Sequence, residues 1–411
     1  MSWDTLFVGI DVSKSSNVAC FVISDEHIPL PKFVFENSQG GAERLVNKIL
    51  EVMAEVKVIK LRIGMEATAF FHYHLLNFLV QSTVLQPYKP QVYAINPRII
   101  KNFKKSYPLR GKNDTYDALM IAERLRLGRG LPPPYEVDDM YQPLQRLTRY
   151  RFHLIGSLIR EKNYFLNMLF LKFSTYHNSD FSNPFGTASL SLINDFFSTD
   201  EIAAMPLEEL AVFLAEKGRY KFESPIDLAV QIQKIARDAY RLKPNMASSV
   251  NTILELSMNN IRFFEQSVNK INNTIEREMR PIFNPLISIP GIGPVLSAGI
   301  ISEIGDISRF ADQSKLAKFA GLTWNEHQSG DFTADETPLN RSGNSYLRYY
   351  LIQSADQLRR HTSEYQAFYA KKYNEARTHA HKRALVLTAR KFVRLIYTLL
   401  STNKIYQPPR T

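Results

Sequence analysis

Four acidic side chains, far apart along the N-terminal part of the chain, are the residues most able to do chemistry. Asp11 lies at the end of an apolar segment, in Gly9–Lys14, and Glu66 ends a second apolar segment in the same way. Asp114 and Asp117 are three residues apart, so on a helix both project from one face. An acid in an apolar strand is costly to bury unless it is paired or bound to a cation.

If these four acids meet at one point, their mutual repulsion keeps some of them from ionising. Two divalent ions about 4 Å apart would offset that repulsion and could clamp the attacking and leaving oxygens at a phosphodiester. Oxygen ligands favour Mg²⁺, with Mn²⁺ as a second possibility, over Zn²⁺. Each acid also has a simpler interpretation. Asp114 is a good helix N-cap, Asp117 suits a helix N-terminus, and Asp11 and Glu66 could be strand-end contacts with solvent.

The elements that must position these acids follow from the apolar pattern. Predicted strands cover residues 6–10, 18–23, 32–35, 58–65 and 92–95, and predicted helices cover 42–56, 70–80 and 114–127. Three strands, helix, strand, helix, strand, helix is the order of the ribonuclease H-like fold, an α/β fold with a mixed sheet. Its first and fourth strands are neighbours and its last helix packs over them. We therefore expect the four carboxylates to converge.

A domain boundary is predicted at Gly128–Pro134, which contains Gly-Arg-Gly and three consecutive prolines, because a helix cannot continue through that run. We expect an α/β catalytic domain at residues 1–136, a helical coiled-coil region at 137–283 and a mostly α-helical C-terminal domain at 284–411. Within the middle region, residues 173–246 carry several helix-start signals and predict a small helical insertion.

The coiled coil is predicted from apolar residues that recur in steps of four and three. The positions are Val250, Leu254, Ser257, Ile261, Phe264, Val268, Ile271 and Ile275. A weaker repeat occupies Leu147, Leu154, Leu158, Phe165 and Met168. The two helices could pair with each other or across a dimer. An ordinary helical bundle inside one subunit fits the pattern nearly as well.

Composition favours a polyanionic partner. The chain of 411 residues carries 51 Lys and Arg against 40 Asp and Glu, a net charge of +11. Basic residues gather in two runs. Arg98–Lys112 holds six and no acid, and Arg359–Arg394 holds ten against two acids, with aromatic residues interleaved. Such a face can neutralise phosphates and stack on bases, although a solvated helix face explains either run alone.

Other classes of protein are excluded. A single cysteine, Cys20, permits neither an internal disulfide nor a multi-cysteine zinc site. No apolar stretch approaches the roughly 20 residues of a membrane span, and the N-terminus lacks the features of a signal peptide. We expect a cytoplasmic, nucleoid-associated prokaryotic protein with no membrane partner.

At this point the chain resembles a known family. Gly9–Lys14, Glu66–Thr68 and Lys112–Ala118 look like the three N-terminal blocks of the insertion-sequence-family-110 transposases, which also include pilin-gene invertases. The N-terminal domain of that family is similar to the Holliday-junction resolvase RuvC. The resemblance implies that Asp11, Glu66, Asp114 and Asp117 form an Asp-Glu-Asp-Asp tetrad that uses magnesium.

The resemblance continues near the C-terminus, through Ser288–Pro294, Phe319–Thr323 and Arg341–Asn344. In the family, a serine of this domain attacks the DNA phosphodiester and forms a covalent phosphoserine link. Ser329 is the matching residue, and Ser342 and Ser345 are nearby competitors. A tetrad with its metals would activate that hydroxyl and stabilise charge on the phosphate.

The family also implies partners: double-stranded DNA of the element ends and target, a noncoding guide (bridge) RNA, and further copies of the chain in a dimer or tetramer. We expect nucleic acid to contact basic residues in and beside the two basic runs and the matched motifs. These are Lys14, Lys101, Lys104, Lys105, Arg110, Lys112, Arg341, Arg348, Lys382 and Arg383.

The leading hypothesis is therefore a DNA transposase or site-specific recombinase that acts through a serine–phosphodiester intermediate. A DNA invertase would use the same site. A RuvC-like junction endonuclease would need the acids but not Ser329. A non-catalytic nucleic-acid-binding protein would cut no strand at all.

Overall fold

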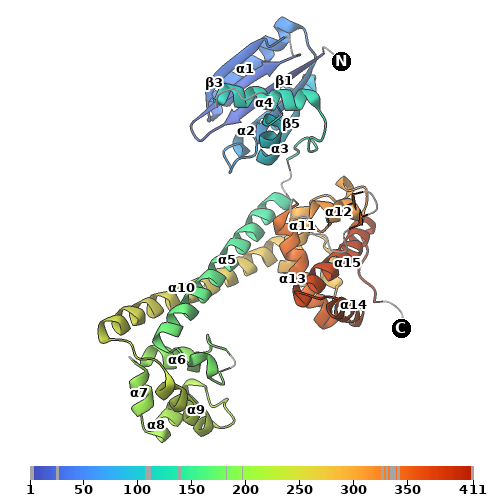
Figure 1. Cartoon of the computed structure of the whole chain (residues 1–411). Helices are drawn as coiled ribbons and strands as arrows, with labels where there is room; N and C mark the ends of the chain where they lie inside the picture. Colours follow the sequence, from blue (N-terminus) through green and yellow to red (C-terminus); the bar gives the residue numbers. More distant parts are fainter. Residues whose placement is uncertain are drawn as a thin grey trace. The chain divides into compact units, whose positions relative to one another are not determined.

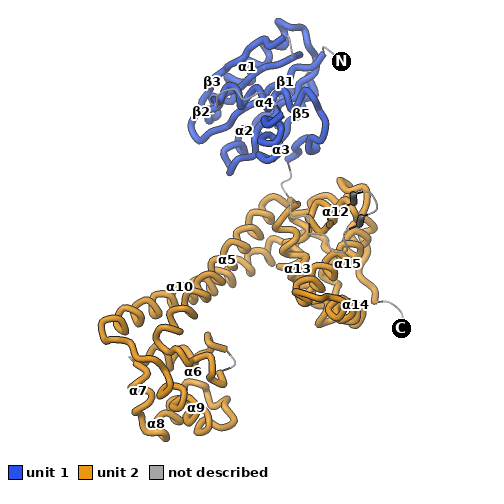
Figure 2. The backbone as a smooth tube through the Cα atoms, viewed as in Figure 1, with its two compact units in different colours: residues 1–138 blue, residues 139–411 orange. Residues whose placement is uncertain are grey.

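The polypeptide divides into two units, residues 1–138 and 139–411 (Figure 2). The computed structural model describes residues 4–24, 27–106, 113–137, 140–181, 183–196, 198–324, 328–329, 332–333, 339 and 343–408. The first unit is α/β and the second is predominantly helical.

The first unit contains a mixed sheet with helices around it. In chain order its elements are β1 (Thr5–Val12), β2 (Ser16–Val22), β3 (Leu30–Glu36), α1 (Gln39–Val56), β4 (Lys60–Glu66), α2 (Tyr73–Gln81), η1 (Gln86–Tyr88), β5 (Gln91–Ile95), α3 (Pro97–Lys104) and α4 (Asp114–Leu127). The strand order is β3-β2-β1-β4-β5. β1 is antiparallel to β2 and parallel to β4, and β5 is parallel to β4. The prediction of an α/β N-terminal domain with a mixed sheet is confirmed.

The sheet buries both faces because its strands alternate their side chains. Leu6 and Val8 of β1 pack with Leu45 and Ile49 of α1 in one core. Phe7 lies in a second core, formed with one side of α4. Figure 1 shows α4 lying across the sheet. Each face therefore has its own helical cover.

One α-helix of the first unit, α3, was not predicted from the sequence. The expected end of a strand at Asn96-Pro97 is also the start of α3: Asn96 caps it by accepting a hydrogen bond from the backbone N–H of Arg98. Proline fits the first helical position because its missing N–H has no partner there in any case. The first basic run therefore begins on a helix.

The second unit begins with a pair of long helices, α5 (Tyr141–Lys172) and α10 (Pro244–Met279), that run side by side (Figure 1). Six of the eight heptad residues of α10 are buried, and the other two, Phe264 and Ile271, are half-buried. In this structure the two helices pair with each other within one chain, which was one of the two arrangements predicted.

Residues between the long helices form a small helical bundle with an apolar core. It comprises η2 (Tyr176–Asn178), α6 (Thr187–Asp195), α7 (Thr199–Ala204), α8 (Leu207–Lys217) and α9 (Pro225–Asp238). Lys172 joins this bundle to α5, since its Nζ donates to the carbonyls of Ile193 at 2.5 Å and Phe196 at 2.6 Å. Burial lowers the pKa of Lys172 to about 8.

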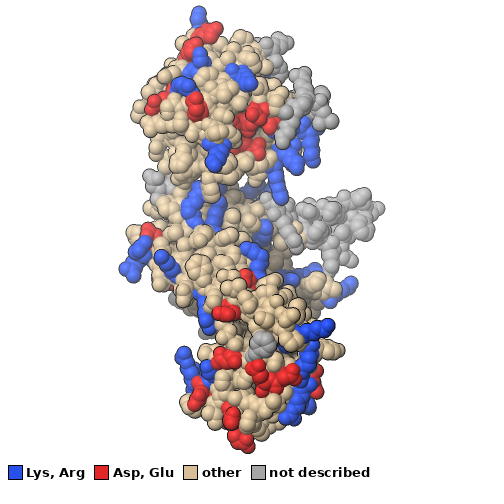
Figure 3. All heavy atoms as spheres, turned by 90° about the vertical axis from the view of Figure 1, so that its left-hand side faces the viewer, with Lys and Arg blue, Asp and Glu red and all other residues tan. Residues whose placement is uncertain are grey.

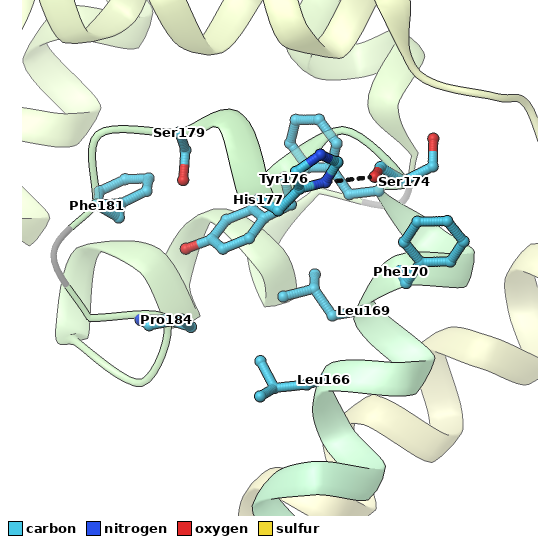
Figure 4. Close-up of a pocket in the computed structure, with 10 residues that line it drawn as sticks. Leu166, Leu169, Phe170, Ser174, Tyr176, His177, Ser179, Phe181 and Pro184 are labelled. Carbon is cyan, nitrogen blue, oxygen red and sulfur yellow. Dashed lines mark hydrogen bonds between the residues drawn. The ribbon is translucent and has the colours of Figure 1, made fainter. Parts of the chain in front are cut away.

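A pocket of about 240 Å³ opens where α5 meets this bundle. Leu166, Phe170 and Phe181 give it an apolar lining, and His177 Nδ1 lies 3.1 Å from the carbonyl oxygen of Ser174 (Figure 4). The described residues that line it include no Lys, Arg, Asp or Glu.

The C-terminal part of the second unit packs around one large apolar core that includes Leu347, Tyr350 and Phe392. Its elements are η3 (Pro285–Ser288), α11 (Pro294–Ile304), η4 (Ile307–Arg309), α12 (Gln313–Phe319), β6 (Gln328–Ser329), β7 (Phe332–Thr333), α13 (Ser345–His361), α14 (Ser363–Asn374) and α15 (Ala380–Thr402). Among the described residues, none of the helices has the length and apolar character that crossing a lipid bilayer requires.

Candidate metal and nucleophile sites

Asp11 and Glu66 lie on neighbouring strands at the same end of the sheet. In the parallel ladder Gly9 pairs with Gly64 and Ile10 with Met65, so the next step along both strands brings Asp11 level with Glu66. Side chains at matched positions of adjacent strands point to the same face. The two carboxylates are therefore on one face of the sheet, and both are half-buried.

That face is the one covered by α4, as two glycines show. A Cβ added at Gly9 would lie 2.2 Å from the backbone oxygen of Ala118, and a Cβ added at Gly64 would lie 2.9 Å from the side chain of Leu125. Asp11 and Glu66 each follow these glycines by two residues, so they share the face. The glycines let α4 approach the sheet closely.

Asp114 and Asp117 lie in the first turn of α4. The helix starts there because Asn113 Oδ1 accepts a hydrogen bond of 2.7 Å from the N–H of Tyr116. It ends at Gly128, whose φ of +69° suits glycine. Asp117 is half-buried and Asp114 is exposed.

The charges of the other three acids act on Asp11. Burial and the negative charges of Asp117, Asp114 and Glu66 raise the pKa of Asp11 to about 6, although the charge of Lys104 acts in the opposite direction. When neighbouring acids raise the pKa of a carboxyl group, a cation that binds among them stabilises its anionic form. The convergence of all four acids at one point remains a prediction.

A lysine occupies part of this cluster. Lys104 Nζ, at the end of α3, lies 2.8 Å from Asp117 Oδ1. Thr68 Oγ1 donates to Glu66 Oε1 at 3.0 Å. Within the residues that the structure describes, no three Asp, Glu, His or Cys side chains are arranged to hold a metal ion. Lys104 pairs here with Asp117, and its predicted contact with nucleic acid remains a prediction.

Replacing Lys104 by Met is expected to strengthen divalent-cation binding, because the ammonium no longer competes for Asp117. Mn²⁺ affinity measured by calorimetry should rise by about fivefold, the equivalent of one partly exposed ion pair of about 1 kcal/mol. Without metal the variant should melt at a lower temperature. Lys101→Met, an exposed change on the same helix, is the matched control. Equal Mn²⁺ affinities in the two variants would contradict the competition.

Gly9→Ala is expected to displace α4, because the new methyl group meets backbone atoms that cannot turn aside. We expect a loss of about 1–3 kcal/mol in the free energy of unfolding and a fall in metal affinity as Asp114 and Asp117 move. Chemical denaturation and calorimetry measure these. Gly40→Ala in α1 is the control, since its Cβ would meet nothing within 4 Å. If Gly9→Ala behaved like this control, the close approach would not matter for the site.

Ser329, the predicted nucleophile, lies in β6, which pairs with β7 through Ser329 and Phe332. It belongs to the second unit, whereas the four acids belong to the first. The structure places Asp11 and Glu66 on the sheet face covered by α4, whose first turn carries Asp114 and Asp117. The roles of the four acids and of Ser329 remain predictions. Ser342 lies outside the described residues.

The predicted nucleic-acid contacts have different surroundings. Lys14, Lys101, Lys105, Lys382 and Arg383 are exposed. Arg348 is half-buried, and its Nη1 donates to the carbonyl of Ala320 at 3.0 Å. Arg110, Lys112 and Arg341 lie outside the described residues. The exposed lysines are therefore the stronger candidates for phosphate contacts.

Some basic residues of the second basic run pair with acidic side chains of the protein itself. Lys391 Nζ pairs with Glu364 at 2.7 Å and lies 4.8 Å from the ring centre of Phe368, and Arg359 pairs with Asp356. On the face drawn in Figure 3, Lys and Arg are interspersed with Asp and Glu. The number of basic residues in the sequence thus overstates the positive charge available to a partner.

Two family models match the chain. Residues 8–173 match the model for transposases of the DEDD, IS110 type, and residues 284–370 match the model described as transposase IS116/IS110/IS902 family. The first match includes all four acids, and the second includes Ser329.

Similar curated proteins extend over nearly the full length. An uncharacterized 44.8 kDa protein of insertion element IS116 from Streptomyces clavuligerus is 24% identical, over 98% of this chain and 97% of its own. A pilin gene-inverting protein from Moraxella lacunata is 23% identical, over 97% of this chain and 96% of its own. A transposase for element IS1111A from Coxiella burnetii is 27% identical, over 49% and 53%.

Proposed function

The chain belongs to the IS110 family of transposases, and from that premise we propose that it cuts and rejoins DNA through a phosphodiester link to Ser329, with the four acids as a metal site. The observation that carries the proposal is the placement of Asp11 and Glu66 on the sheet face covered by α4, with Asp114 and Asp117 in the first turn of that helix. As a transposase it acts on DNA. Our proposal adds the chemical reaction and the roles of individual residues in it.

We propose that the first unit is a ribonuclease H-like, RuvC-like catalytic domain. The sheet order β3-β2-β1-β4-β5, in which β2 runs opposite to the other four strands, supports this assignment. The acids lie on its first and fourth strands and its last helix, as in that fold. The functional parts we propose are residues 1–136, the helical region at 137–283 with its insertion at 173–246, and the serine domain at 284–411.

The residue types suit a divalent cation, although among the described residues no three of them are arranged as ligands in the absence of an ion. Their donor atoms are all oxygens, and burial together with the charges of the other acids raises the pKa of Asp11, so a cation beside Asp11 would favour its anion. Asp11, Glu66, Asp114 and Asp117 would hold Mg²⁺ or Mn²⁺, with Lys104 released from Asp117. When bound, such ions stabilise the negative charge that develops on a phosphate oxygen.

In the proposed reaction, the Ser329 hydroxyl attacks a DNA phosphorus atom. The bond from Oγ to phosphorus forms, and one bond from phosphorus to a deoxyribose oxygen breaks. The proton of the serine hydroxyl ends on that leaving deoxyribose oxygen. Attack by a deoxyribose hydroxyl of another strand reverses these steps, joins the new strand and frees the serine.

We further propose a noncoding guide RNA and a dimeric or tetrameric assembly as partners. The net charge of +11 and the exposed Lys101, Lys105 and Lys382 are compatible with holding RNA or DNA backbones. Base pairing would then choose the target and the protein would read the shape of the duplex. Sequencing the RNA that copurifies with the chain tests this partner; finding only bulk cellular RNA would remove it.

The test of the reaction is to trap its intermediate. The protein is incubated with Mg²⁺ and the DNA that flanks its coding sequence, and covalent adducts are isolated under denaturing conditions. We expect mass spectrometry to find the nucleotide on Ser329, and no adduct in EDTA. An adduct on another residue would overturn the assignment of Ser329. Cleaved DNA without any adduct would indicate a RuvC-like junction endonuclease instead.

DNA inversion is a second candidate, favoured by the full-length similarity to the pilin gene-inverting protein. Inversion and transposition use the same chemistry and differ in how the cut sites are arranged. A plasmid carrying two sites in inverted orientation distinguishes them: an invertase turns the intervening segment around, and a transposase moves it to another molecule.

A further inference from the structure

A buried glutamate connects three separate elements of the second unit. Glu303, near the end of α11, is 2% exposed. Its carboxylate accepts two hydrogen bonds from Arg149 of α5, from Nε at 2.7 Å and from Nη2 at 2.8 Å. It also accepts one from Asn344 Nδ2 at 2.7 Å. A buried carboxylate is tolerated because it is paired in this way.

Asn344 uses both ends of its side chain. While Nδ2 donates to Glu303, Oδ1 accepts hydrogen bonds of 3.0 Å from the N–H groups of Tyr346 and Leu347 and so caps α13. Its backbone N–H donates to the carbonyl of Phe319 at 2.6 Å. The start of α13 is therefore fixed to both α11 and the end of α12.

The chain segments on either side of Ser329 are held together at the same place. A Cβ added at Gly343 would lie 2.3 Å from the backbone nitrogen of Gly321, so the two backbones touch. Arg348 Nη1 donates to the carbonyl of Ala320 at 3.0 Å. Residues 319–321 and 343–348 thus form a closed base for the segment that contains Ser329.

We propose that Glu303 is a positioning residue for Ser329: with Asn344 and Arg149 it forms a polar clasp that fixes the base of the serine segment against α5. The inference rests on the proposed role of Ser329. Replacing a buried ion pair by apolar side chains often leaves stability unchanged or raises it, so stability alone does not account for a charge here. Alignment of a nucleophile does, because a displacement of about 1 Å can cost about 10²-fold in rate.

The test exchanges the two hydrogen-bonding groups. Glu303→Gln removes the charge that holds Arg149, and Asn344→Asp keeps the helix cap but sets a second carboxylate against Glu303. In the double variant the amide at position 303 can donate to the carboxylate at position 344, which reverses the direction of the original hydrogen bond. The total charge of the clasp is preserved. Each single variant should form the Ser329–DNA adduct about tenfold more slowly or worse, with unchanged DNA affinity. The double variant should recover most of the lost rate.

Leu351→Ala is the matched control, since Leu351 is buried in the same core. All variants are compared well below their melting temperatures. Hydrogen exchange at residues 319–321 and 343–348 should rise in the single variants and not in Leu351→Ala. The inference is overturned if the single variants are no slower than this control, or if the double variant is as slow as the poorer single one. If the wild-type protein itself forms no Ser329 adduct, the proposed function is wrong, and the positioning role of Glu303 that rests on it is wrong as well.

Discussion

Replacement of Asp11 by Asn is expected to lower strand cleavage by about 10²–10³-fold or more while DNA binding survives. Asp11 is half-buried at the end of β1, on the face covered by α4, so its loss is expected to weaken cation binding. An asparagine of the same size keeps the strand packing. Cleavage is measured on labelled DNA with Mg²⁺, and binding is measured by fluorescence anisotropy.

Glu66→Gln and Asp114→Asn should have the same effect, because they remove ligands from the same cluster. Glu43→Gln, an exposed acid on α1, is the control for loss of a negative charge. The three site variants should also lose the rise in melting temperature that Mg²⁺ gives the wild type. Full cleavage activity in any two of them would remove the assignment of the metal site.

Replacement of Ser329 by Ala is expected to abolish both the covalent adduct and strand exchange, since no other group then supplies the attacking oxygen. Ser342→Ala should retain both. The adduct is measured on denaturing gels with labelled DNA, and exchange is measured by sequencing the joined products. Binding of Mn²⁺ should be unchanged in Ser329→Ala, because the acids lie in the other unit.

A covalent adduct that persists in Ser329→Ala and disappears in Ser342→Ala would transfer the nucleophilic role to Ser342. Strand cleavage without an adduct in Ser329→Ala would instead indicate that water can replace the serine, as a junction endonuclease requires. The two variants therefore separate the recombinase from the nuclease.

The residues of the candidate metal site could be proposed from the sequence because the proposal depends on local patterns. An acid at the end of an apolar strand stands out in the sequence, and the strand order of the first unit follows from the alternation of its elements. Asp114 and Asp117 could be assigned to one helix face from their spacing. The role of Gly9 was less visible, since only the packing of α4 shows why a side chain cannot be accommodated there.

Other residues could not be interpreted from sequence alone. Lys104 and Arg348 were assigned to nucleic acid because they are basic, and the sequence did not reveal that Lys104 pairs with Asp117 or that Arg348 donates to the carbonyl of Ala320. Their contacts with nucleic acid remain predictions. The sequence analysis gave Glu303 no role, although an acid within the apolar helix Pro294–Ile304 is unusual and could have drawn attention to it. Its partners come from distant parts of the chain.

The sequence by itself determined that the N-terminal domain is α/β and which residues of the two long helices are buried, because each depends on residue type and a spacing of two, three or four. It also predicted which residues could bind a cation. The tertiary structure decided which of the possible partners each charge has, and that α5 and α10 pair within one chain. Those choices depend on contacts between distant segments. Their energies are set by burial and distance, and sequence spacing contains neither quantity.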